Sequence, residues 1–297
     1  MTRTKLFLIV LVLLAAAIGL ILAFASPPGV LNFLNSHTPG DANAEKVATA
    51  VPYGPDPAQK LNVWAPKDRK PGQTYPVLVF YYGGGWAMGS RDEYDFAGRA
   101  FAARGFVVVV PDYRLVPKVR YPVFVQDSAL AVKWTRDHVA QFGGDARRLT
   151  LSGHSAGAYN AAMLALDGRW LRDVGVDPKI VRAAALLAGP YDFYPFDKPR
   201  SIAAMGAWPR PLETQPIRFA AHDSPPLLLI HGTADDVVRP HNSERLAAKL
   251  KSLGAPVELK MYPGKSHNDL IMGVSKPLRF KSPALADSIA FLKAHSR

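Results

Sequence analysis

The sequence predicts an α/β fold, with a mostly parallel sheet flanked by helices. Continuous apolar runs of strand length, Val77–Tyr82 and Phe106–Val110, enclose a stretch of helical periodicity at Tyr94–Arg104. Parallel strands buried on both faces have continuous apolar sequences, and regular strand–helix alternation is typical of parallel sheets. The chain has 297 residues, 48% of them hydrophobic, and shows no change of composition in its middle. We therefore predict one core domain over residues 45–297.

The first half of this domain contains the elements that set the edge and centre of the sheet. Lys60–Ala65 (KLNVWA) alternates apolar and polar residues as a half-exposed strand does, so we expect an antiparallel hairpin at the sheet edge. The two apolar runs have the β-branched and aromatic composition of central strands. The helix between them should end at Gly105, because glycine often follows a helix C-terminus. A second helix is predicted at Val123–Phe142, closed by Gly143 and Gly144.

The second half repeats the alternation. A strand at Leu149–Ser152 leads into an Ala-rich helix at Ala156–Leu166. Three more strands and two helical stretches follow, at Arg182–Leu187, Pro226–His231 and Val257–Tyr262, and at about Ser243–Leu253 and Pro283–His295. Sites in such sheets lie at the carboxyl ends of the strands. We therefore look for reactive residues there.

The N-terminus carries an apolar run, Leu6–Ala25, preceded by Arg3 and Lys5. About 20 apolar residues at 1.5 Å each can cross a hydrocarbon core of roughly 30 Å. We interpret residues 1–25 as an uncleaved signal anchor that places the domain outside the cytoplasm, in the periplasm or the extracellular space. The alternative is a signal peptide cleaved after Ala23-Phe24-Ala25, which has the A-x-A form, and a secreted domain. Residues 26–44 are rich in Pro, Gly, Asn and Ser and are expected to be a linker or a partly ordered lead-in.

Charge and composition exclude several classes of function. The net charge is +12, but the basic residues are scattered in short pairs such as Arg147-Arg148, and no nucleic-acid-binding motif accompanies them. We therefore expect no nucleic-acid partner. The absence of cysteine from the sequence excludes disulfides, thiolate metal sites and a cysteine nucleophile.

The segment Gly153-His154-Ser155-Ala156-Gly157 matches the pattern G-x-S-x-G. A predicted strand ends directly before it and a predicted helix begins directly after it. This strand–turn–helix order is that of a nucleophile elbow, in which small residues allow a tight turn that exposes the serine hydroxyl. Ser155 is therefore the candidate nucleophile.

A serine hydroxyl needs a base, and the base needs an acid that orients it. Among eight histidines, His267 is the best placed, because it follows the strand Val257–Tyr262 by a short loop. His231 ends a strand, where a structural hydrogen bond to the adjacent acidic loop is expected. Of the adjacent acids Asp235 and Asp236, only one can face the imidazole, and we choose Asp235.

The strand Val77–Tyr82 is followed by three glycines and Trp86. Glycines let the backbone approach a substrate closely and present its N–H groups. Such donors stabilise the oxyanion of a tetrahedral intermediate. We assign this role to the N–H groups of Gly84 and Gly85, with that of Ala156 from the elbow.

Together these segments resemble bacterial esterases and lipases of the α/β-hydrolase superfamily. Tyr82–Trp86 is similar to their HGGGW loop and Gly153–Gly157 to their GHSAG elbow. Further similar segments are Asp112–Leu115 (DYRL), Asp127 at a helix start, His231–Val238 (HGTxDxxV) and Tyr262–His267 (YPGxxH). The match runs from about Val51 to the C-terminus.

The resemblance implies the α/β-hydrolase fold and a carboxylic-ester hydrolase acting on small-molecule esters without metal or organic cofactor. It implies the triad Ser155, Asp235 and His267, and the same three oxyanion donors. Tyr82 stands where the family usually has His, so we expect altered hydrogen bonding in the loop and retained activity.

The segment Asp192–Pro225 lies between two predicted strands and contains Phe193, Tyr194, Phe196, Met205, Trp208 and Phe219. We expect a small cap that shapes an apolar pocket and favours short to medium acyl chains, with ordinary loop packing as the alternative. The same triad on an amide or formamide, as in arylformamidases, is a second possible activity. A peptidase of this fold is disfavoured, because the chain has no room for the large additional domain that such enzymes often carry. A non-catalytic binding protein would not need the complete set of reactive residues.

Overall fold

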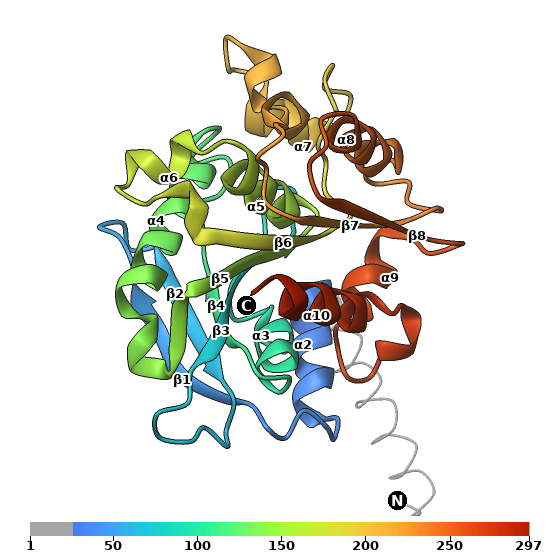
Figure 1. Cartoon of the computed structure of the whole chain (residues 1–297). Coiled ribbons are helices and arrows are strands. Elements are labelled where there is room, and N and C mark those ends of the chain that lie inside the picture. Colours follow the sequence, from blue (N-terminus) through green and yellow to red (C-terminus); the bar gives the residue numbers. More distant parts are fainter. Residues whose placement is uncertain (1–25, 297) are drawn as a thin grey trace, which may run out of the picture.

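Seven of the eight strands described here run in one direction, and β2 alone runs against them. The computed structural model describes residues 26–296 (Figure 1). Across the sheet the strands follow the order β1-β2-β4-β3-β5-β6-β7-β8. They comprise β1 Glu45–Pro52, β2 Lys60–Ala65, β3 Tyr75–Tyr81, β4 Val107–Pro111, β5 Gly144–His154, β6 Val181–Leu187, β7 Leu227–Gly232 and β8 Val257–Tyr262. The predicted mostly parallel sheet is confirmed.

The central strands are buried from end to end. Every residue of β3, β4 and β7 is buried, as the continuous apolar runs predicted. β3 pairs in parallel with both β4 and β5. Burial on both faces of these strands fixes their position, so the loops at their carboxyl ends start from a rigid base.

The hairpin at the edge of the sheet is present, but the exposure of its second strand was predicted wrongly. β2 pairs antiparallel with β1 on one side and with β4 on the other. Five of its six residues are buried, including the polar Asn62, whose Nδ2 donates to Asp92 and Asp95. The alternation of the sequence therefore reflects a satisfied buried amide. β1, which no sequence pattern predicted, occupies the edge instead.

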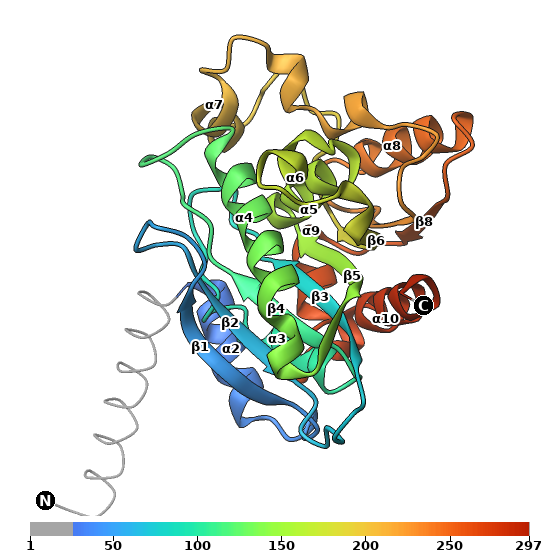
Figure 2. The ribbon, with the colours of Figure 1, turned by 60° about the vertical axis from the view of Figure 1, so that its left-hand side comes forward.

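Helices cover both faces of the sheet (Figure 1 and Figure 2). One face is covered by α3 (Asp95–Ala102) and α10 (Ala284–His295), with α2 (Pro27–His37) against α3. The other carries α4 (Val123–His138), extended by a 3₁₀ turn to Phe142, together with α5 (Ala156–Leu166) and α8 (His241–Ser252). The remaining helices are short: α6 Arg169–Asp173, α7 Pro199–Met205 and α9 His267–Met272.

The segment 26–44 begins with a helix that its composition did not suggest. The Ser26 hydroxyl caps α2 by accepting a hydrogen bond from the Gly29 N–H, and Pro27 stands at the first helical position. The predicted signal anchor or signal peptide, residues 1–25, lies outside the described residues. Within residues 26–296, no helix has the length and apolar character that a membrane crossing requires.

Candidate active site

The turn between β5 and α5 holds Ser155 in a strained conformation. Its φ of 56° and ψ of −121° lie in a region that residues with a side chain rarely adopt. A Cβ on Gly153 would lie 2.5 Å from the Gly157 carbonyl carbon, and one on Gly157 would lie 2.1 Å from the Tyr81 oxygen. Both glycines are therefore required by close backbone approach. The Ser155 N–H donates to the Leu187 carbonyl at 2.9 Å, which ties the turn to β6.

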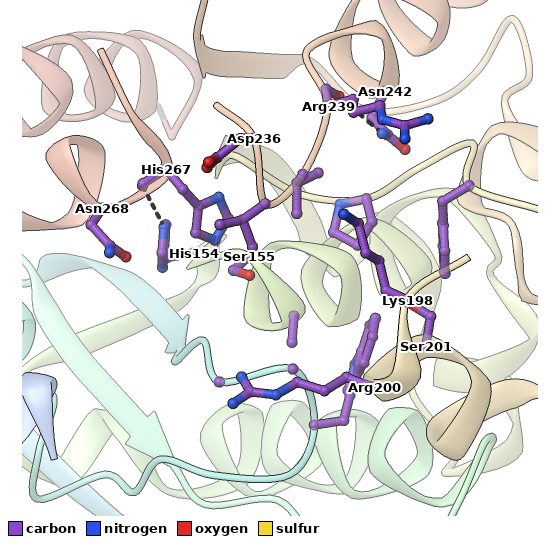
Figure 3. A pocket seen from close by; sticks show the side chains of 18 of the residues that line it. His154, Ser155, Lys198, Arg200, Ser201, Asp236, Arg239, Asn242, His267 and Asn268 are labelled. Carbon is purple, nitrogen blue, oxygen red and sulfur yellow. Dashed lines mark hydrogen bonds between the residues drawn. The ribbon is translucent and has the colours of Figure 1, made fainter. Parts of the chain in front are cut away.

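His267 and Asp235 form a buried hydrogen-bonded pair. His267 Nδ1 lies 2.7 Å from Asp235 Oδ2, although the residues are 32 positions apart in the chain. His267 is the first residue of α9, whose start is fixed by a capping box between Ser266 and Asp269. Because Nδ1 donates to the carboxylate, Nε2 keeps its lone pair. Figure 3 shows His267 next to Ser155, and both residues line one cavity.

Asp235 is held as a carboxylate by four contacts. Its Oδ1 accepts from the Val237 and Val238 N–H groups at 3.0 and 2.9 Å. Its Oδ2 lies 3.2 Å from His231 Nε2 in addition to the bond with His267. Burial raises the pKa of Asp235, but the hydrogen bonds from His231 and His267 outweigh it and hold this pKa well below its usual range. The neighbouring Asp236 is exposed, so the acid that meets the imidazole is the one chosen from the sequence.

His231 has the structural role that its position indicated. Its Nε2 donates to the Val238 carbonyl at 2.8 Å, which fixes the tautomer, so Nδ1 accepts from the Ser243 hydroxyl at 2.7 Å. The ring is fully buried. His231 thus links α8 to the loop that carries Asp235 and helps to hold this acid in position.

His154 packs beneath the turn as a neutral ring. Its Nε2 donates to the His267 carbonyl at 3.1 Å, and the two imidazole centroids are 4.7 Å apart. No described residue pairs with its Nδ1. Burial, reinforced by the proximity of His267, lowers the pKa of His154 to about 3. The His154 ring therefore packs against His267 and helps to hold it in position.

The three predicted donors for an oxyanion line the same cavity as Ser155. Gly84 and Gly85 have φ of +132° and +61°, and a Cβ on Gly84 would lie 2.1 Å from the Met88 oxygen. Within residues 26–296 no group accepts a hydrogen bond from the N–H of Gly84, Gly85 or Ala156. These three donors are therefore available to a ligand.

Tyr82, at the start of the glycine loop, is held by aromatic packing and backbone hydrogen bonds. Tyr82 is buried and its ring stacks on Tyr113 at a centroid distance of 4.5 Å. The Tyr113 hydroxyl donates to the Tyr82 carbonyl at 2.8 Å. Aromatic stacking thus supports the start of the glycine loop. The other family-like acid, Asp127, is fully buried and accepts from Arg114 and Gln59, away from the cavity.

The cavity has a volume of about 980 Å³ and draws its walls from distant parts of the chain. The predicted cap supplies Phe193 and Tyr194, whereas the other four apolar residues that suggested the cap, Phe196, Met205, Trp208 and Phe219, do not line it. Helix α2 supplies Pro27, Pro28 and Leu31, which no sequence signal indicated. In residues 26–296 no cluster of three or more His, Asp or Glu side chains could hold a metal ion.

Comparison with known proteins places this arrangement in a family. The sequence model of the family described as BD-FAE matches residues 61–250. Esterase LipC of Mycobacterium tuberculosis is 33% identical over 75% of this chain and 60% of its own length. The isoprenylcysteine alpha-carbonyl methylesterase ICME of Arabidopsis thaliana is 27% identical over 83% of this chain and 62% of its own length. The chain thus spans about three fifths of these curated relatives.

Two solved structures share the fold. A structure of Thermogutta terrifontis esterase 2, phosphonylated by cyclosarin, superposes with a TM-score of 0.70 at 26% identity, over 87% of this chain and 96% of that one. A truncated carbohydrate esterase from gut microbiota superposes with a TM-score of 0.73 at 22% identity, over 87% and 99% of the two chains. The second likeness concerns the fold alone.

Proposed function

Since the chain belongs to the BD-FAE family, within the α/β-hydrolases, we propose that it hydrolyses carboxylic esters through an acyl-enzyme on Ser155. The observation that carries the proposal is the buried pair of His267 Nδ1 and Asp235 Oδ2, 2.7 Å apart, beside a strained serine in the same cavity. The names of the relatives agree with ester hydrolysis and differ in the ester they specify.

The geometry supports a two-step mechanism. His267 Nε2 takes the hydroxyl proton as Ser155 Oγ forms a bond to the ester carbonyl carbon, and the carbonyl oxygen becomes an oxyanion. The N–H groups of Gly84, Gly85 and Ala156 stabilise that oxyanion. The intermediate collapses when the C–O bond to the alcohol breaks, and His267 returns its proton to the leaving oxygen. Water then attacks the acyl-enzyme with His267 again as base, which releases the acid and restores Ser155.

Labelling with a fluorophosphonate probe tests the nucleophile directly. The wild-type chain should be labelled on one serine, and Ser155→Ala should lose both the label and the hydrolysis of p-nitrophenyl butanoate. Ser252→Ala, an exposed serine at the end of α8, is the matched control and should keep both. Wild-type protein that takes no label and hydrolyses no ester would favour a non-catalytic binding protein.

A substrate panel tests the acyl-chain preference. The short cap favours p-nitrophenyl esters of short to medium chains, so kcat/KM should fall for long chains. N-formyl arylamines in the same panel separate ester hydrolysis from the arylformamidase alternative. Faster turnover of the formamides than of any ester would replace the proposed reaction by amide hydrolysis.

We further propose that the domain is exported and held at a membrane by residues 1–25. Support comes from the apolar run Leu6–Ala25 and its basic flank. Pro27 and Pro28, two and three residues after the run, line the cavity, so anchoring would keep the cavity near the membrane surface. Alkaline extraction of membranes should leave the full chain in the pellet. A mature soluble protein that begins at Ser26 would show the cleaved alternative instead.

A further inference from the structure

Two cationic side chains without an ionic partner line the wall of the cavity that the cap provides. Lys198 is the N-cap residue of α7, and Arg200 is the second residue of this helix. Both are exposed and both line the cavity. In the part of the chain that the structure describes, no carboxylate lies within ion-pair distance of either side chain. Figure 3 shows both on the same side of Ser155.

The other two cations of the cavity are already paired. Arg239 lies 3.3 Å from Asp197, and Arg245 lies 2.9 Å from Asp192. These two pairs also account for two of the three acids that line the cavity.

The third acid lies on the opposite side of the cavity. Asp236 belongs to the loop after β7, and in Figure 3 it lies across Ser155 from Arg200. Asp236 therefore repels a bound anion least at the cap wall, the side of the cavity formed by Lys198 and Arg200. The positive charge of Lys198 and Arg200 is left uncompensated on that wall.

Arg200 lies directly against the glycine loop. A Cβ on Gly85 would meet Arg200 Cδ at 2.5 Å and Nη1 at 3.3 Å, which shows how closely this side chain approaches the loop. Its Nη2 also contacts Met88 Sδ at 3.6 Å, which holds the guanidinium over the loop. Because Gly85 carries one of the proposed oxyanion donors, the guanidinium is placed next to the ester that would react.

We infer that Lys198 and Arg200 are specificity-determining residues that select esters carrying a negatively charged group, such as a carboxylate or a phosphate. The inference rests on the proposed ester hydrolysis. An anion at the cap wall interacts with two positive charges that no described side chain neutralises, and a guanidinium matches a carboxylate or phosphate with paired hydrogen bonds. The same charges raise the rate of encounter with an anionic substrate at low salt.

Matched pairs of esters test the inference on the full-length wild-type protein. Mono-p-nitrophenyl adipate and p-nitrophenyl hexanoate have acyl chains of equal length and differ by one terminal carboxylate. Meta-carboxyphenyl butanoate and phenyl butanoate place the same difference on the alcohol side. The expected result is a kcat/KM about tenfold higher for the charged member of at least one pair, a preference that shrinks as salt screens the charges. The pair that shows the preference identifies the side of the ester that faces α7.

Two variants assign the preference to these residues. Arg200→Gln and Lys198→Gln should each reduce the charged-to-neutral ratio of kcat/KM severalfold. Arg218→Gln is the control, because Arg218 is exposed in the same segment, has no described ionic partner and does not line the cavity. It should leave the ratio unchanged.

The possible failures are distinguishable. If the wild type hydrolyses neutral esters and shows no preference in either pair, the inference is wrong and the proposed function stands. If Arg200→Gln slows both members of a pair equally, Arg200 acts on the reaction in general and not on specificity. If no ester in either pair is hydrolysed, the proposed function itself fails.

Discussion

The two sides of the cavity are built by opposite physical means. The acid–base side, formed by His154, His231, Asp235 and His267, is buried, and each imidazole and carboxylate has hydrogen-bond partners within the protein. The cap side, formed by Tyr194, Lys198 and Arg200, is exposed, and within residues 26–296 its cations have no ionic partner.

The difference indicates which part of the molecule fixes chemistry and which part selects substrate. Buried polar groups in a medium of low dielectric are costly unless every partner is present, so the acid–base side tolerates little change. Exposed side chains on a short helix interact mainly with water and ligand, so the cap side can change without loss of the fold. Substitutions on the two sides should therefore give effects of very different size.

The largest effect is expected for Asp235→Asn. The amide cannot keep His267 in the tautomer that presents a free Nε2, so kcat should fall about 10⁴-fold with little change in structure. Steady-state kinetics with p-nitrophenyl butanoate, with circular dichroism as a control for folding, measures this. A loss of less than about tenfold would show that the buried side is not the catalytic one.

Gly157→Ala should cause the largest loss of stability. Its Cβ would lie 2.1 Å from the Tyr81 oxygen, a backbone atom that cannot move without the strand, so unfolding free energy should drop by about 3 kcal/mol. Gly175→Ala is the matched control, because a Cβ there has nothing within 4 Å. Its positive φ alone should cost about 1 kcal/mol. Urea denaturation of both variants compares them, and equal losses would contradict the close-packing argument.

The buried side should also make the protein sensitive to acid. Because the pKa of His154 falls to about 3 on folding, the unfolded chain binds one more proton between that pH and the ordinary histidine pKa near 6.5. The stability that depends on a neutral His154 ring is fully present above about pH 6.5. As the pH falls from there toward 3, the free energy of unfolding decreases by about 1.4 kcal/mol per pH unit. His154→Asn should flatten the plot of unfolding free energy against pH by that slope. An unchanged slope between pH 4 and 6 would contradict a buried neutral ring.

The smallest effect is expected on the cap side. Ile202 is 52% exposed, so Ile202→Ser should change the unfolding free energy by less than about 0.5 kcal/mol. Thermal or urea denaturation measures it. A loss of more than about 2 kcal/mol would mean that the cap is part of the cooperative core, and the contrast between the two sides would disappear.

The cap and helix α2 contain features that could not be predicted from the sequence. Of the six residues that suggested a cap, Phe193 and Tyr194 line the cavity, whereas the other four pack against the core. Pro27 and Leu31 carry no signal of a site, since their role depends on where α2 lies against α3. Likewise, Arg200 is an ordinary surface arginine in the sequence and meets Gly85 only after folding.

The amino-acid sequence by itself determined the parallel sheet, the elbow around Ser155 and the choice of Asp235 and His267 as candidates, because each depends on local spacing relative to a strand end. The tertiary structure alone decided the burial of β2, the edge strand β1, the contact of His154 with His267, and the cationic wall formed by α7. These features join residues far apart in the chain, and no local pattern of residues encodes how distant segments pack.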